Sequence, residues 1–122
     1  MSGSFNDLDV PPTLVSFAVA PAKCSTTISP EFKKTGSIVS LVNVPRDTHL
    51  RPDFEALKRI AKQLHELSST GEILSMHSLG EGGLAAGLFQ MAAGNEIGFR
   101  ADDPTKASEL FHERYASSLA EP

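Results

Sequence analysis

Three glycines and one acidic residue stand together where a short apolar run gives way to a run of helix-forming residues. Gly80, Gly82 and Gly83 surround Glu81, and the helix-forming run at 84–93 follows directly. Glycine adopts positive φ angles readily and lets a ligand approach the backbone, because it has no Cβ. The first turn of a helix presents unpaired N–H groups and the positive end of the helix dipole, and both favour a phosphate. These residues therefore predict an anion-binding turn.

Two other interpretations fit the same residues. A tight connection between a strand and a helix needs glycine for packing alone, and this interpretation has the same weight as a phosphate site. Glu81 does not decide between them, because an acid at a helix start is stabilising by roughly 0.3 to 1 kcal/mol without any ligand. Gly80, Gly82 and Ala85 also match the dinucleotide-binding pattern G-x-G-x-x-G/A, with aspartates at 102 and 103 about twenty residues further on. Against that pattern, the glycines do not follow the first strand of a complete βαβαβ unit.

Histidine and hydroxyl groups beside the turn add further chemistry. His77 lies at the end of the predicted strand, where it can act as a general acid, donate to a phosphate or fill a core position, and the core position is the commonest for a lone histidine. Ser78 follows it, but neighbouring strand residues point to opposite faces, so the two cannot form a catalytic pair. The other histidines lack the spacing of a metal site, and Cys24 has no histidine near it in sequence. We expect no metal site and no catalytic residue.

Composition and charge narrow the classes of protein. The chain has 122 residues, of which 40% are hydrophobic and 21% charged, as in a single globular α/β domain. Its net charge is −4 and its 11 basic residues are scattered, so nucleic acid is not an expected partner. The single cysteine, the lack of a signal sequence and the lack of an apolar run near the roughly 20 residues of a membrane span predict a cytoplasmic protein that does not contact a membrane.

Hydrophobic periodicity predicts alternating strands and helices. A helix over residues 54–67 is the clearest of them, because Asp53 suits its start and Gly71 its end. Two more helices are expected, at 84–93 and, after Asp103-Pro104, around Leu110 and Phe111. Strands are expected at 13–20, 37–44, 73–76 and 97–101, with one more beginning over 117–120. The expected fold class is therefore α/β (α+β), with a mixed sheet and flanking helices.

Four segments together resemble a known family. In chain order they are VPPTLVSFA at 10–18, HSLGEGGLA at 77–85, MAAGNEIGF at 91–99 and LFHERYAS at 110–117. The first is similar to that family's VPPTLV strand, and the last is similar to its LF-x-x-x-YGS segment. The chain resembles phosphoribosylformylglycinamidine synthase (FGAM synthetase), in part of its second aminoimidazole ribonucleotide synthetase-like half.

This resemblance implies a fragment of a longer enzyme. The family converts formylglycinamide ribonucleotide and glutamine to formylglycinamidine ribonucleotide in de novo purine biosynthesis, as an amidoligase that uses ATP and Mg²⁺. By the resemblance, residues 1–36 end the preceding synthetase N-terminal-type subdomain and connect it onward, and residues 37–122 form part of the synthetase C-terminal-type domain. The implied partners are the remaining synthetase and glutaminase domains and a small ribonucleotide substrate. The resemblance also implies that this chain alone neither turns over nor binds a cofactor tightly.

The resemblance assigns site residues as well. His77, Glu81, Gly82 and Gly83 fall on the family's H-D-x-S-D-G-G-L motif at its His, its second Asp and its paired glycines. Gly80 stands where the motif has Ser. The resemblance therefore implies that these five residues contact the substrate phosphate or the nucleotide.

One departure from the motif points to a supporting role. Ser78 replaces the motif's first Asp, and a hydroxyl is a far weaker ligand for Mg²⁺ than a carboxylate. A non-catalytic, structural half is therefore the alternative to a catalytic one. We also expect exposed sheet edges and apolar surface, and these make self-association through strand pairing a further expectation.

Overall fold

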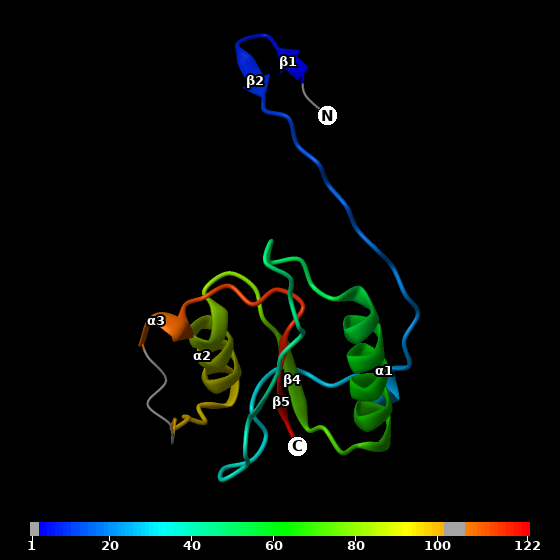
Figure 1. The fold of residues 1–122 in the computed structure, drawn as a ribbon, viewed down its shortest axis with the longest axis vertical. Coiled ribbons are helices and arrows are strands. Elements are labelled where there is room, and N and C mark those ends of the chain that lie inside the picture. Colours follow the sequence, from blue (N-terminus) through cyan, green and yellow to red (C-terminus); the bar gives the residue numbers. More distant parts are fainter. Residues whose placement is uncertain (1–2, 102–106) are drawn as a thin grey trace.

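The computed structural model describes residues 3–101 and 107–122, and it consists of a helix-flanked sheet with an extended N-terminal arm (Figure 1). A small hairpin at the far end of the arm pairs β1 (Gly3–Phe5) with β2 (Leu8–Val10). The remaining elements are a short 3-10 helix (Cys24–Thr26), β3 (Ser40–Val42), α1 (Phe54–Thr70), β4 (Ser75–Ser78), α2 (Gly83–Asn95), α3 (Ala107–Leu110) and β5 (Ser118–Glu121).

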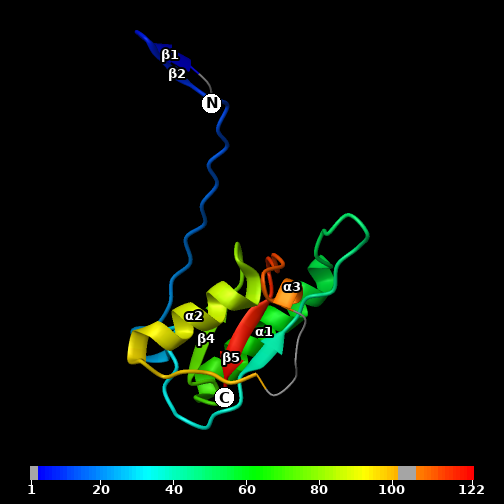
Figure 2. The ribbon, with the colours of Figure 1, turned by 90° about the vertical axis from the view of Figure 1, so that its left-hand side faces the viewer.

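The main sheet has three strands in the order β3-β5-β4, and both pairings are antiparallel. β5 is the central strand, with Leu119 opposite Leu41 on one side and opposite His77 on the other. The two long helices lie on opposite faces of this sheet, α2 in front of it and α1 behind it in the second view (Figures 1 and 2). The expected α/β fold with helices flanking a sheet is confirmed.

The hydrophobic core lies between α2 and the sheet. Phe32, Leu79, Met91 and Leu119 form its buried centre, and partly buried residues of α2 and its surroundings pack against them. Gly87 lets α2 approach the sheet closely, because a Cβ placed there would lie 2.5 Å from Cδ2 of Leu79. The glycine that costs α2 some helix propensity is thus required by the packing of the core.

The helix α1 begins and ends where the sequence predicts. The Asp53 carboxylate caps its start by accepting hydrogen bonds from the backbone N–H of Glu55 and Ala56, both at 3.0 Å. Gly71 ends it in the left-handed conformation, with φ of 80°. The apolar side of α1 faces the second side of the sheet across a cavity of about 320 Å³, which is lined by Leu57, Ile60 and Leu64 among others.

A buried carboxylate fixes the loop after residue 30 to the sheet. Glu121 on β5 is fully buried, and it accepts hydrogen bonds from the backbone N–H of Lys33 at 2.8 Å, the backbone N–H of Lys34 at 3.0 Å and the hydroxyl of Ser75 at 2.8 Å. Burial by itself raises the pKa of this carboxyl, but the hydrogen bonds outweigh burial and hold its pKa below the usual value. The ionised side chain therefore anchors the loop that carries Phe32 into the core.

Two predicted strands are wrong. Residues 13–20 form no strand and lie exposed along the arm, because within the described residues no neighbouring strand pairs with them. Residues 97–101 are irregular, since the chain leaves α2 through Glu96 in a left-handed conformation and Ile97 N–H donates back to Ala92 O at 3.2 Å.

The other elements differ from the prediction mainly in their ends. The strand predicted at 37–44 is shortened to β3, the one at 73–76 is moved to β4, and the one beginning over 117–120 is confirmed as β5. Helix α2 is two residues longer at its C-terminal end than predicted. The helix α3 ends at Leu110, so Phe111 lies outside it, and the predicted cap at Asp103-Pro104 lies outside the described residues.

Candidate functional site

The glycine turn between β4 and α2 requires glycine at two positions. Gly82 has φ of 77° and Gly83 has φ of 57°, and both values lie in the left-handed region that other residues rarely adopt. The Gly83 N–H donates to Gly80 O at 3.2 Å and closes the turn, and Ala86 N–H donates to Gly82 O at 3.2 Å as the helix begins. The positive φ angles expected from the sequence are therefore present.

A second segment of chain presses against this turn. A Cβ placed on Gly83 would lie 2.2 Å from His112 O and 2.9 Å from Leu110 O, which are backbone atoms of the segment that follows α3. Both are carbonyl oxygens, whose partial negative charge suits the positive end of the α2 dipole. Packing alone thus explains Gly83, as one of the two alternative interpretations supposed.

The start of α2 still offers donors to an anion. Gly82 is its N-cap, and within the described residues no side chain caps this end. In the first turn of a helix the N–H groups have no partner inside the helix, and here Gly83 N–H already bonds to Gly80. The amides of Leu84 and Ala85, the next two positions, are therefore the ones that a bound phosphate would use.

His77 lies against the same helix, one turn away from the glycines. Its half-buried side chain is on the α2 face of the sheet, with Cδ2 3.4 Å from the position of a Cβ on Gly87. Ser78 is on the opposite face and borders the cavity beneath α1. The two side chains point to opposite sides of the sheet, as predicted, and His77 occupies a packing position between sheet and helix.

Sequence reasoning missed Tyr115 as a neighbour of the turn. A Cβ placed on Gly80 would lie 3.6 Å from Cε1 of the Tyr115 ring. Partial burial raises the pKa of the Tyr115 hydroxyl, and the carboxylates of Glu113 and Glu81 raise it further. Glu81 itself is exposed, and its carboxylate lies near enough to the Tyr115 hydroxyl for its charge to raise that pKa. The only sequence signal was the LF-x-x-x-Y spacing of the segment that carries the tyrosine.

An arginine in this segment is incompletely bonded. Nε of Arg114 is buried and has no hydrogen-bond partner among the described residues. A buried donor without a partner is destabilising by about 1 to 3 kcal/mol, and it is commonly explained by a water or ion. Arg114 directly precedes Tyr115, so a cation belongs to the segment that encloses the glycine turn.

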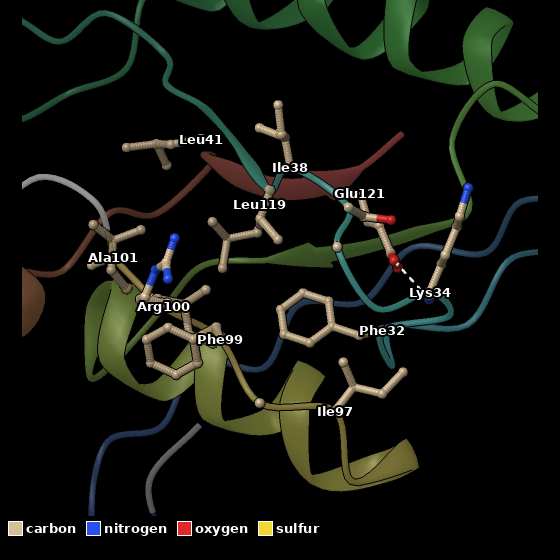
Figure 3. A pocket seen from close by; sticks show the side chains of 16 residues that line it. Phe32, Lys34, Ile38, Leu41, Ile97, Phe99, Arg100, Ala101, Leu119 and Glu121 are labelled. Atoms are coloured by element: carbon tan, nitrogen blue, oxygen red, sulfur yellow. Dashed lines mark hydrogen bonds between the residues drawn. The ribbon is translucent and has the colours of Figure 1, made fainter.

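A larger cavity than the one beneath α1 lies away from the turn, over β3 and beside α2. Its volume is about 790 Å³, and its lining combines apolar and polar surface, with Phe32, Phe99 and Leu119 among the apolar residues (Figure 3). Lys34 and Arg100 also line it, and a hydrogen bond joins Lys34 to Glu121 at one side. Of the residues near the turn, the cavity includes only Leu84.

The described residues were also compared with what a metal site and a membrane-spanning helix require. Within 3–101 and 107–122, no group of three or more His, Cys, Asp or Glu side chains gathers as a metal site would require. In the same part of the chain, no helix combines the length and the hydrophobicity needed to cross a membrane.

The dinucleotide-binding interpretation is wrong. That site requires a strand, a glycine turn and a helix that lead to a parallel neighbouring strand. Here β4, the strand before the turn, pairs antiparallel with β5, and β5 pairs antiparallel with β3. The aspartates at 102 and 103 lie outside the described residues.

Comparison with known proteins agrees with this geometry. The sequence model of a family described as AIR synthase related protein, C-terminal domain, matches residues 34–119, a range that contains the whole glycine turn. Among solved structures, one titled "T. maritima PurL complexed with AMPPCP" superimposes with a TM-score of 0.61 at 16% sequence identity. The match covers 82% of this chain and 19% of that one, so it shows the fold of a part of that protein. No curated protein matches the sequence significantly.

Proposed function

This chain belongs to the family of AIR synthase related proteins, C-terminal domain, and from that membership we propose that it is part of a phosphoribosylformylglycinamidine synthase. Such an enzyme is an ATP-dependent amidoligase of purine biosynthesis, and a cytoplasmic location is part of the proposal. The observation that carries it is the family match over 34–119, supported by a fold that resembles part of T. maritima PurL.

Within this proposal, the glycine turn holds the phosphate of a ribonucleotide. The amides of Leu84 and Ala85 donate to phosphate oxygens at the positive end of α2, and Arg114 supplies a compensating charge through the Nε that lacks a partner among the described residues. Gly80, Gly82 and Gly83 keep the approach free of side chains.

The two ionisable motif residues have different roles in this proposal. The Glu81 carboxylate repels a phosphate at short range, so it accepts hydrogen bonds from ribose hydroxyls beside the phosphate instead. His77 packs under Gly87 and supports the strand that leads into the turn. We propose that neither residue takes part in bond making.

ATP and Mg²⁺ belong to the proposed parent enzyme. The described residues do not fit a metal site, because they contain no group of three potential ligands and Ser78 stands in place of the motif's acid. No step on this chain runs through the metal. We propose that the remaining synthetase and glutaminase domains supply the catalytic groups, with residues 1–36 ending the preceding subdomain and 37–122 forming part of the C-terminal-type domain.

A second candidate function has an observation in its favour. The carbonyl oxygens of His112 and Leu110 abut Gly83, and this contact requires glycine without any ligand. The chain is then the structural half of the same enzyme, in which the turn supports the sheet and the neighbouring domain.

A calorimetric titration with ribose 5-phosphate distinguishes the two candidates. We expect a dissociation constant on the order of 1 mM for the chain, because one helix start and one arginine hold a single phosphate. Arg114→Gln is expected to weaken binding about tenfold. The matched control is Arg59→Gln, which removes an exposed arginine from α1 and leaves binding unchanged. Absence of heat with correctly folded protein would favour the structural half, and equal effects of the two substitutions would exclude Arg114 from the site.

A further inference from the structure

Two segments that are distant in sequence meet beside the glycine turn. One is residues 43–46, which follow β3, and the other is residues 114–117, which follow α3 and which we call the wall. Val44 N–H donates to the hydroxyl of Ser117 at 3.3 Å, and that hydroxyl donates to Oδ1 of Asn43 at 3.2 Å. Figure 1 shows the orange chain after α3 crossing the chain that leads from β3 to α1. Ser117 is 1% exposed, so a buried hydroxyl joins the two segments.

The same serine ties the wall to the glycine turn. Its carbonyl oxygen accepts a hydrogen bond from Leu79 N–H at 2.8 Å, one residue before Gly80, and its own N–H donates to Arg114 O at 3.0 Å. Tyr115, between these two residues of the wall, places its ring against Gly80. The cation of the proposed phosphate site, Arg114, therefore belongs to a segment whose position depends on residues that follow β3.

Arg46 adds a charged hydrogen bond to this junction. Its Nη2 donates to Tyr115 O, and a hydrogen bond from a guanidinium is roughly twice as strong as a neutral one. Among the described residues no carboxylate forms an ion pair with Arg46. The backbone beside it is fixed, because Asp53 N–H donates to Pro45 O at 2.8 Å at the start of α1. A half-buried arginine on an anchored segment thus bonds to the main chain of the wall.

We infer that Arg46 is a positioning residue of the proposed phosphate site. By bonding to Tyr115 O it holds the wall, and with it Arg114, in place beside the start of α2. This role of Arg46 rests on the proposed function of the turn, and Arg46 itself does not touch the ligand. Loss of Arg46 leaves the hydrogen bonds of Ser117 intact, so the wall loosens at Tyr115 while the fold persists.

The tyrosine of the wall reports this role directly. The chain has one tyrosine and no tryptophan, so the phenolate absorbance belongs to Tyr115 alone. Partial burial and the carboxylates of Glu113 and Glu81 raise the pKa of Tyr115. When the wall leaves the turn in Arg46→Gln, burial and Glu81 act less on the hydroxyl, and its pKa falls. Loss of the Arg46 charge alone would raise this pKa, because a cation stabilises the phenolate. The direction of the change therefore separates a positioning role from a purely electrostatic one.

Spectrophotometric titration of the full chain measures this pKa. We expect a lower tyrosine pKa in Arg46→Gln than in the wild type, and a smaller change in Arg46→Lys, which keeps a donor for Tyr115 O. The matched control is Arg51→Gln, which should leave the pKa unchanged, because Arg51 is exposed in the same loop and pairs with Asp47. Glu81→Gln should lower the pKa less in the Arg46→Gln background than in the wild type. An unchanged or raised tyrosine pKa in Arg46→Gln overturns this role.

Binding of ribose 5-phosphate tests Arg46 at the site itself. In an NMR titration that follows the Leu84 and Ala85 amides, we expect Arg46→Gln to weaken binding about fivefold or more, and Arg46→Lys to weaken it less. Equal affinities of Arg46→Gln and of a wild type that binds overturn the positioning role. A wild type that binds no ribose 5-phosphate counts against the proposed function, and the tyrosine pKa then still decides whether Arg46 holds the wall.

Discussion

Replacement of Gly83 by alanine tests whether the segment after α3 presses on the glycine turn. Gly83 has φ of 57°, and a left-handed alanine is destabilising by about 1 to 2 kcal/mol. Its Cβ would also lie 2.2 Å from His112 O, a backbone atom that cannot rotate away. Overpacking of this kind is destabilising by a further 1 to 3 kcal/mol or so. We therefore expect Gly83→Ala to lower the free energy of unfolding by about 2 to 5 kcal/mol.

Gly71 provides the control that separates the two contributions. It has φ of 80°, but a Cβ placed there meets nothing within 4 Å, so Gly71→Ala carries only the conformational cost of about 1 to 2 kcal/mol. Urea unfolding followed by circular dichroism measures both variants, and we expect their midpoints to differ by about 1 M at an unchanged denaturant slope. Equal losses of stability in the two variants would refute the close contact between Gly83 and the 110–112 backbone.

Three further substitutions test the described contacts. Glu121→Ala leaves the backbone N–H groups of two lysines without their buried acceptor, so we expect a loss of about 3 kcal/mol or more in urea unfolding. Because the pKa of Glu121 is lowered on folding, its contribution to the free energy of unfolding is present above the unfolded pKa of roughly 4.3 and is lost as pH falls through the folded pKa. The same pH dependence of stability in the wild type and in Glu121→Ala would contradict this. Asp53→Ala removes the cap of α1 and should lower stability by about 1 kcal/mol, whereas an unchanged urea midpoint would mean that the cap is replaced by water. Glu81→Gln removes a carboxylate that raises the pKa of Tyr115, so spectrophotometric titration should find a lower tyrosine pKa than in the wild type. An unchanged pKa would show that the Glu81 carboxylate does not interact with the Tyr115 hydroxyl.

The sequence predicted correctly those features that depend on residues close together in the chain. Both ends of α1, at Asp53 and Gly71, were predictable because helix capping depends on a few neighbouring residues. The glycine turn was predictable for the same reason, since positive φ angles at Gly82 and Gly83 are a property of the turn itself. The antiparallel direction of β4 and β5, which excludes dinucleotide binding of the Rossmann type, was not visible in the order of the elements.

The features that the sequence did not reveal depend on contacts between distant residues. Glu121 receives hydrogen bonds from a loop 87 and 88 residues earlier, and nothing near it in sequence identifies it as a buried anchor. Tyr115 approaches Gly80 only because the chain after α3 folds over the turn. The segment 13–20 has the residue pattern of a strand, yet a strand also requires a neighbour, and the described part of the chain provides none.

The backbone amides of the turn give the most direct test of the proposed phosphate site. Heteronuclear NMR spectra of the chain, recorded during addition of ribose 5-phosphate and, separately, of free ribose, report each amide individually. The proposal predicts that the Leu84 and Ala85 resonances shift with ribose 5-phosphate in a saturable manner, and that free ribose leaves them in place. Unchanged Leu84 and Ala85 resonances at saturating ribose 5-phosphate, or equal shifts with free ribose, would contradict a phosphate site at the start of α2.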